Sequence, residues 1–290
     1  MVETYRPDNL EEALKIRNSE KAIPFAGGTD LMVKYKSWTG TLPKFPLPLI
    51  FLGHLPELIC IEKHKDFVSI GASTTLSTIE YDKRIPLHLR KAISMMAAPP
   101  IRNIATIGGN IGNASPAGDT ICPLITLDAC ITLNSLNASR RILLKDFIMG
   151  PGRTLLKDNE IITKIDIPLK TYNIELYRKV GTRKANALSK LSFSGVANIS
   201  NNKIDKIHIS VGAVAPIVVR SKEIEKKIIG LRLHEVKSKK EEIIQGYSAL
   251  IKPIDDQRST STYRKKVSIN ILKYFLTIIT NKMDKNKNLC

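Results

Sequence analysis

The chain has 290 residues, 43% of them hydrophobic, which is enough for two or three domains with full cores. It carries 45 Lys and Arg against 27 Asp and Glu, a formal net charge of +18, but the lysines are scattered with few aromatic residues between them, which argues against a nucleic-acid partner. The four cysteines and five histidines show no metal-ligand spacing, and the apolar run Leu47–Leu55 is too short to span a bilayer, so we expect a cytoplasmic protein with no metal site and no membrane span.

The N-terminal residues predict a helix, a short strand and a glycine-rich turn. Asp8 is placed to cap a helix over Leu10–Arg17, and Ala22–Ala26 is typical of a short buried strand. The strand runs into the first glycine turn, Phe25–Leu31, after which Asp30 is expected to cap a second helix.

The middle of the chain mixes strand and helix patterns and leads to a second glycine turn. The expected strands are Leu49–Leu52, Leu58–Glu62 and Phe67–Gly71, and the expected helices are Thr75–Ile79 and Leu87–Ala98, the latter ended by Pro99 and Pro100. The second glycine turn, Thr106–Asn110, follows at once. Both turns therefore lie at element boundaries, where backbone N–H groups are expected to be available.

The last part of the chain predicts strands followed by helices. A strand is expected over Ile161–Pro168 and a domain boundary near residues 168–172. Beyond it we expect strands over Val196–Ile199 and Ile207–Val211, and helices over Ser221–Ile229, Leu233–Leu250 and Tyr263–Thr280. This order indicates an α+β fold.

The paired glycine turns are the strongest functional signal. A lone Gly-Gly is most often an ordinary tight turn, but two such turns, each followed by Thr or Asn, could hold the phosphates of one ligand from both sides. Neither turn is a G-x-G-x-x-G fingerprint or a P-loop, so a Rossmann dehydrogenase and a P-loop kinase are disfavoured. Asp119, which follows the second turn, could bind a ribose or adenine edge or could hold its own loop.

The motifs Ala26–Leu31, Thr106–Asn110 and Ala114–Asp119 resemble those of the FAD-binding medium subunits of molybdenum hydroxylases, the family of xanthine and carbon monoxide dehydrogenases. Further similar residues, such as Gly150–Glu160 and Tyr177–Lys184, occur in the same order along nearly the whole chain. The 4-hydroxybenzoyl-CoA reductase branch is disfavoured, since the chain lacks the cysteine-bearing insertion of that branch.

The resemblance implies a two-lobed FAD-binding domain of the p-cresol methylhydroxylase and vanillyl-alcohol oxidase type, followed by a C-terminal α/β domain. We expect the FAD-binding domain over residues 1–170, with lobes of about 1–55 and 56–170. The C-terminal domain is expected over 171–281 and a flexible basic tail over 282–290.

The family's FAD contacts carry over to matching positions of this sequence. Backbone N–H groups and the side chains of Thr29, Thr106 and Asn110 are expected at the diphosphate, Asp119 at the adenosine end, and Lys179 as a basic contact from the C-terminal domain. Met96 and Ile162 match apolar contacts by spacing alone. The complete set of expected cofactor-binding residues is Pro24, Phe25, Ala26, Gly27, Gly28, Thr29, Asp30, Leu31, Met96, Thr106, Ile107, Gly108, Gly109, Asn110, Asp119, Ile162 and Lys179.

The implied function is electron transfer through FAD as one subunit of a larger oxidoreductase. The implied partners are a large subunit with the molybdenum cofactor and a small subunit with two [2Fe-2S] clusters, and the implied acceptor is NAD or another oxidant. Xanthine is the favoured substrate of the complex only because xanthine dehydrogenases are common. Two alternatives stay open, a stand-alone FAD oxidoreductase of the same fold and an FAD-free basic scaffold or nucleic-acid-binding module.

Overall fold

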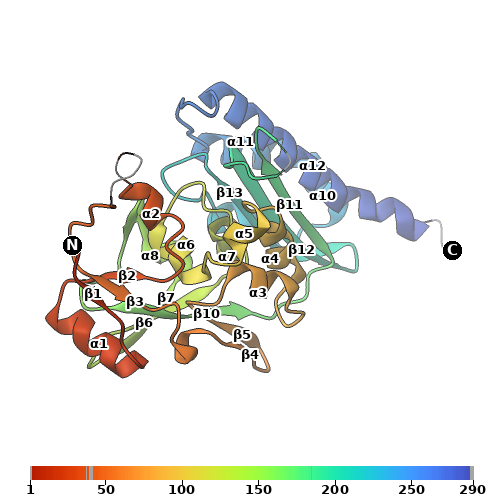
Figure 1. The fold of residues 1–290 in the computed structure, drawn as a ribbon. Helices are drawn as coiled ribbons and strands as arrows, with labels where there is room; N and C mark the ends of the chain where they lie inside the picture. Colours follow the sequence, from red (N-terminus) through yellow and green to blue (C-terminus); the bar gives the residue numbers. More distant parts are fainter. Residues whose placement is uncertain (1, 37, 39–41, 184, 288–290) are drawn as a thin grey trace. The chain divides into compact units, whose positions relative to one another are not determined.

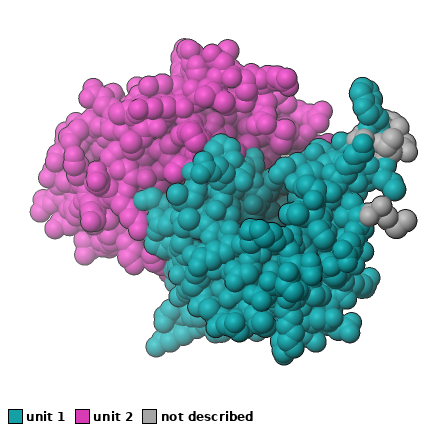
Figure 2. All heavy atoms as spheres, turned by 90° about the vertical axis from the view of Figure 1, so that its left-hand side faces the viewer, with its two compact units in different colours: residues 1–115, 128–169 teal, residues 116–127, 170–290 magenta. Residues whose placement is uncertain are grey.

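The structure, a computed structural model, describes residues 2–36, 38, 42–183 and 185–287. The chain divides into two compact units, residues 1–115 with 128–169 and residues 116–127 with 170–290 (Figure 2). Residues 116–127, which lie inside the expected FAD-binding domain, belong to the second unit, a grouping that no sequence pattern indicated. Both glycine turns belong to the first unit.

The N-terminal lobe of the first unit is a three-stranded parallel sheet with the order β1-β3-β2 (Figure 1). Its strands are β1 (Thr4–Tyr5), β2 (Ile23–Phe25) and β3 (Leu49–Phe51), and helix α1 spans Leu10–Ser19. The apolar side of α1 packs on this sheet, with Ala13 and Leu14 in one buried cluster with Ile50.

The cap of α1 differs from the prediction. Asn9 is the N-cap, and its Oδ1 accepts a hydrogen bond from the Glu12 N–H at 2.9 Å. The predicted cap at Asp8 is wrong, because Asp8 lies one residue outside the helix and its backbone N–H donates to the Glu12 side chain at 2.7 Å.

The second lobe of the first unit is a five-stranded antiparallel sheet with the order β4-β5-β10-β6-β7. Its strands are β4 (Ile61–Lys63), β5 (Phe67–Gly71), β6 (Cys130–Asn134), β7 (Ser139–Leu143) and β10 (Ile161–Pro168), and a small hairpin follows from β8 (Ile148–Gly150) and β9 (Arg153–Thr154). The bounds predicted for β5 and β10 agree with the structure. The predicted strand at Leu58–Glu62 begins only at Ile61, because Pro56 opens a 3₁₀ turn, η1 (Pro56–Leu58).

Short helices connect the strands of the first unit. They are α2 (Leu31–Lys34), α3 (Leu76–Tyr81), α4 (Leu87–Ser94), α5 (Pro99–Arg102), α6 (Ile107–Asn113) and α8 (Leu144–Phe147). Helix α4 ends four residues earlier than predicted, and Ala97 has a left-handed φ of 42°. Pro99 begins a new helix instead of only ending the previous one, which agrees with the preference of proline for the first helical position.

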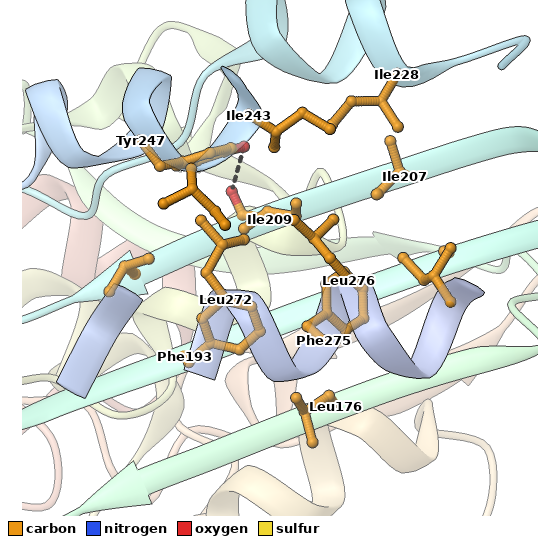
Figure 3. Close-up of a cluster of buried hydrophobic side chains, with 14 of the residues drawn as sticks. Leu176, Phe193, Ile207, Ile209, Ile228, Ile243, Tyr247, Leu272, Phe275 and Leu276 are labelled. Atoms are coloured by element: carbon orange, nitrogen blue, oxygen red, sulfur yellow. Dashed lines mark hydrogen bonds between the residues drawn. The ribbon is translucent and has the colours of Figure 1, made fainter. Parts of the chain in front are cut away.

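The second unit is built on an antiparallel sheet of β11 (Ile174–Val180), β12 (Leu191–Ser200) and β13 (Lys203–Gly212). Its helices are α7 (Ile121–Thr126), α9 (Lys222–Ile228), α10 (Leu233–Ser238), α11 (Lys240–Leu250) and α12 (Ser261–Lys287). One sheet face forms an apolar core with α11 and α12, where Phe193 packs against Phe275 and the Tyr247 hydroxyl donates to the Ile209 carbonyl (Figure 3). The other face carries α7, whose Thr126 carbonyl lies 2.7 Å from His208 Nδ1.

The C-terminal helices differ from the predicted ones in two places. The helix predicted over Leu233–Leu250 is split at Lys239 into α10 and α11. Helix α12 continues to Lys287 and so includes most of the segment expected to be a flexible tail, while residues 288–290 lie outside the described part. Among the described helices, none is long and apolar enough to cross a membrane.

Candidate functional site

A cavity of about 260 Å³ in the first unit lies between the two glycine-rich segments. Its walls come from both lobes of that unit. The lining residues are Ile23, Pro24, Ala26, Gly27, Gly28, Thr29, Asp30, Leu31, Lys34, Leu52, Ala72, Ser73, Ala105, Thr106, Gly108, Gly109, Asn110, Gly112, Asn113, Gly152, Leu156, Ile161 and Ile162. The structure therefore brings together two turns that are about eighty residues apart in the sequence.

The first glycine segment, residues 26–31, joins β2 to α2. Gly28 has a φ of +69°, and a Cβ there would lie 2.2 Å from the Phe25 ring. A Cβ at Gly27 would lie 2.2 Å from the Ile104 carbonyl oxygen. Both glycines are thus required by the packing of the protein itself.

The backbone N–H groups of residues 27–31 donate to no acceptor among the residues that the structure describes. Within the described part of the chain, none of the hydrogen bonds has the N–H of Gly27, Gly28, Thr29, Asp30 or Leu31 as its donor, and the first bonded N–H of α2 is that of Met32, which donates to the Gly28 carbonyl at 2.9 Å. Successive free N–H groups around a left-handed residue form a concave anion-binding surface. This segment can therefore receive a phosphate group.

The second glycine segment, residues 106–110, is the start of helix α6 rather than a free turn. Its N–H groups are used within the protein: Gly108 donates to the Ala72 carbonyl at 2.8 Å, and Gly109 donates to Thr106 Oγ1 at 3.1 Å. The expectation that both segments present available N–H groups is wrong for this one. It contributes a close backbone wall and the Thr106 hydroxyl, whose proton is still available to a ligand.

Two of the three glycines of α6, Gly108 and Gly109, have different neighbours. A Cβ at Gly108 would lie 2.6 Å from the Ala72 Cβ, whereas a Cβ at Gly109 would meet only Thr106 Oγ1, at 2.9 Å. Gly109 is thus the glycine whose missing side chain leaves room beside the cavity.

The side chain of Asp30 does not cap α2, contrary to the prediction. Asp30 Oδ2 instead accepts a hydrogen bond from Asn113 Nδ2 at 3.0 Å. Asn113 is the last residue of α6 and is followed by Ala114 at a left-handed φ of 46°. Asn113 was not predicted, since nothing in the local sequence pattern indicates a partner 83 residues away.

Three of the predicted residues of the first unit do not line the cavity. Phe25 stacks edge-on against Phe51 with ring centroids 5.1 Å apart, and Ile107 and Met96 are buried in the protein. Ile162, predicted by spacing alone, does line the cavity. Lys34 supplies the positive charge in the lining.

Asp119 and Lys179 both belong to the second unit, where they form an ion pair. Lys179 Nζ lies 2.7 Å from Asp119 Oδ2, and their side chains are only 5% and 8% exposed. Ser189 Oγ donates to the other carboxylate oxygen at 2.5 Å. Burial raises the pKa of the Asp119 carboxyl, while Lys179 and Ser189 oppose that shift. The predicted contact of both residues with FAD stays a prediction.

In the residues for which the structure gives a description, no group of three or more His, Cys, Asp or Glu side chains is placed to hold a metal ion.

The sequence matches two domain families. Residues 1–170 match the model described as the FAD binding domain in molybdopterin dehydrogenase, and residues 176–279 match the CO dehydrogenase flavoprotein C-terminal domain. The first match includes every residue that lines the cavity.

Individual relatives support the same assignment. The chain is 32% identical over 269 residues to the glyceraldehyde dehydrogenase medium chain of Sulfolobus acidocaldarius, covering 90% of this chain and 92% of the relative. It is 35% identical over 198 residues to the nicotinate dehydrogenase FAD-subunit of Eubacterium barkeri, covering 64% and 65%. The solved structure of reconstituted CO dehydrogenase from Oligotropha carboxidovorans is similar with a TM-score of 0.85 at 25% identity, covering 94% of this chain and 96% of that one.

Proposed function

Because the chain belongs to the family of FAD-binding medium subunits of molybdenum hydroxylases, we propose that it collects electrons on a bound FAD and passes them to a final acceptor. It is the flavoprotein subunit of an oxidoreductase, and its cofactor is FAD. In this proposal the electrons come from iron–sulfur clusters of a partner and leave to NAD or another acceptor.

The observation that carries the proposal is the fit between the cavity and a diphosphate. The N–H groups of residues 27–31 have no acceptor in the described protein, and the hydroxyl-bearing residues Thr29 and Thr106 belong to the same lining. An anion needs such donors, and Lys34 adds a positive charge. We infer that these groups hold the diphosphate of FAD.

The remaining predicted residues lie outside the proposed contacts with the diphosphate. Ile162 offers apolar contact in the lining, while Phe25, Ile107 and Met96 lie outside the lining and stay predicted contacts. Asp119 is proposed at the adenosine end with Lys179, and the ion pair between them would fix the orientation of the carboxylate.

When bound, FAD supplies the electron exchange, and the protein positions and tunes it. In this proposal the chain's own residues at the cavity bind the cofactor, and the titratable side chains in its lining are Asp30 and Lys34. Among the described residues that line it, none is His, Tyr, Cys or Glu, and the carboxylate of Asp30 is bonded to Asn113. A stand-alone oxidoreductase with substrate chemistry in this cavity is therefore disfavoured.

We propose that the partners are a large subunit with the molybdenum cofactor and a small subunit with two [2Fe-2S] clusters. The relatives at 32% and 35% identity are named for glyceraldehyde and nicotinate, and the structural neighbour is named for carbon monoxide. In this proposal the partner subunit, rather than this chain, therefore determines the substrate of the complex. Xanthine, the substrate favoured by the sequence analysis, is one outcome of the test.

The test is purification of the native complex, with flavin, iron and molybdenum measured per chain. We expect one FAD per chain, and flavin reduction by xanthine, glyceraldehyde, nicotinate or carbon monoxide only when the partner chains are present. Steady-state turnover by the isolated chain would support the stand-alone oxidoreductase instead. Failure of the purified chain to bind FAD would support the FAD-free scaffold and overturn the proposal.

A further inference from the structure

The hydrogen bond between Asn113 and Asp30 joins the two sides of the cavity. Asn113 Nδ2 lies 3.0 Å from Asp30 Oδ2, and both residues line the cavity, one at the end of α6 and the other in the first glycine segment. The two sides also meet at Gly27, whose backbone lies against the Ile104 carbonyl with no side chain between them. The first glycine segment is thus held at both ends.

Asp30 lies in the same segment as the N–H groups that have no acceptor among the described residues. Asp side chains commonly accept hydrogen bonds from N–H groups of their own loop or from the first turn of the next helix. In this structure Asp30 makes no such cap bond to α2, and its Oδ2 accepts a hydrogen bond from Asn113 instead. Without Asn113, the carboxylate would be the nearest anion able to occupy those donors.

We propose that Asn113 is a positioning residue for FAD binding, which keeps the Asp30 carboxylate away from the N–H groups of residues 27–31. This inference rests on the proposed function, in which those N–H groups receive the diphosphate. The side-chain amide of Asn113 suits this role because it can donate a hydrogen bond to the Asp30 carboxylate and is itself uncharged.

The proposal predicts a particular dependence between the two residues. Asn113→Ala releases the carboxylate, which then competes with the diphosphate for the same donors. Adding Asp30→Ala removes the competitor. If the hydrogen bond were only a tie between the two sides of the cavity, the double variant would bind FAD no better than Asn113→Ala.

The experiment measures the binding of FAD to the apoprotein of the full chain, with quenching of FAD fluorescence as the readout. We expect Asn113→Ala to weaken binding about 10-fold, the scale of one hydrogen bond to a charged group, and the double variant Asn113→Ala/Asp30→Ala to recover most of that loss. Thermal unfolding of the apoproteins checks that each variant folds. A double variant as weak as Asn113→Ala, or weaker, overturns the proposal.

Asn198→Ala is the matched control. It removes an exposed bond of the same type in the second unit, from Asn198 Nδ2 to Asp205 Oδ2 at 3.1 Å, and should leave FAD affinity unchanged. If the proposed function itself were wrong, the experiment would give another result, because the unmodified chain would then bind no FAD at all. If the unmodified chain binds FAD and Asn113→Ala binds it equally well, only the inference about Asn113 is overturned.

Discussion

Substitution of Gly108 and of Gly109 in α6 distinguishes an effect on the stability of the fold from an effect on the cofactor site. In Gly109→Val, the new Cβ meets only Thr106 Oγ1 at 2.9 Å, so the remaining methyl groups enter space beside the cavity. Overpacking of a filled site costs about 1–3 kcal/mol, which corresponds to roughly 5- to 150-fold weaker FAD binding. The apoprotein should change by no more than about 1 kcal/mol, because loss of the Thr106 cap is partly offset by replacing a helical glycine.

Gly108→Val is the comparison for the same experiment. Its Cβ would lie 2.6 Å from the Ala72 Cβ and 2.7 Å from the Ala72 carbonyl oxygen, inside the protein, so the free energy of unfolding should fall by about 1–3 kcal/mol. Thermal unfolding with and without FAD measures both effects, since a bound ligand stabilises the folded state in proportion to its affinity. The reasoning is refuted if Gly109→Val keeps the normal stabilisation by FAD, or if both variants lose stability and affinity together.

Three further predictions concern charged and buried groups. Lys34→Glu should weaken FAD binding about 5-fold at low salt and less at high salt, as expected for an exposed charge, and an effect independent of salt would contradict an electrostatic role. Lys179→Met should lower the free energy of unfolding by about 3 kcal/mol at neutral pH, because it leaves the buried Asp119 carboxylate without its cation. Since burial raises the pKa of Asp119, that loss should shrink as the pH falls and the carboxyl is protonated, which denaturant unfolding at several pH values would check. Burial also lowers the pKa of His88 from 6.5 to about 4, so this group's contribution to stability is present above pH 6.5 and is lost as the pH falls towards 4. The loss amounts to about 3 kcal/mol, and His88→Leu should remove this part of the pH dependence.

Local patterns predicted those parts of the fold in which neighbouring residues decide the structure. The strands β5 and β10 alternate or run apolar between clear breaks, and their bounds were predicted correctly. Pro99 was misread as a stop because the same residue can end one helix or begin the next, and the left-handed Ala97 between them is invisible in the sequence.

Most residues of the two glycine segments that line the cavity were predictable, but the reason for them was less so. The glycine segments were found by composition. Three of their four glycines, Gly27, Gly28 and Gly108, are also required by close packing against Ile104, Phe25 and Ala72, and such tertiary contacts are not visible in a local pattern. The availability of N–H groups also depends on such contacts, since the carbonyl that takes the Gly108 N–H comes from Ala72, far earlier in the chain. Asn113 was missed for the same reason.

Hydrogen exchange at individual peptides tests the central claim most directly. In the protein without FAD, the amides of residues 27–31 have no acceptor in the described chain, so they should exchange fast, whereas those of Gly108 and Gly109 are already bonded. Addition of FAD should slow exchange strongly in peptides covering residues 27–31 and only slightly in those covering 107–110. Unchanged exchange at residues 27–31 in protein that has bound FAD would contradict the account.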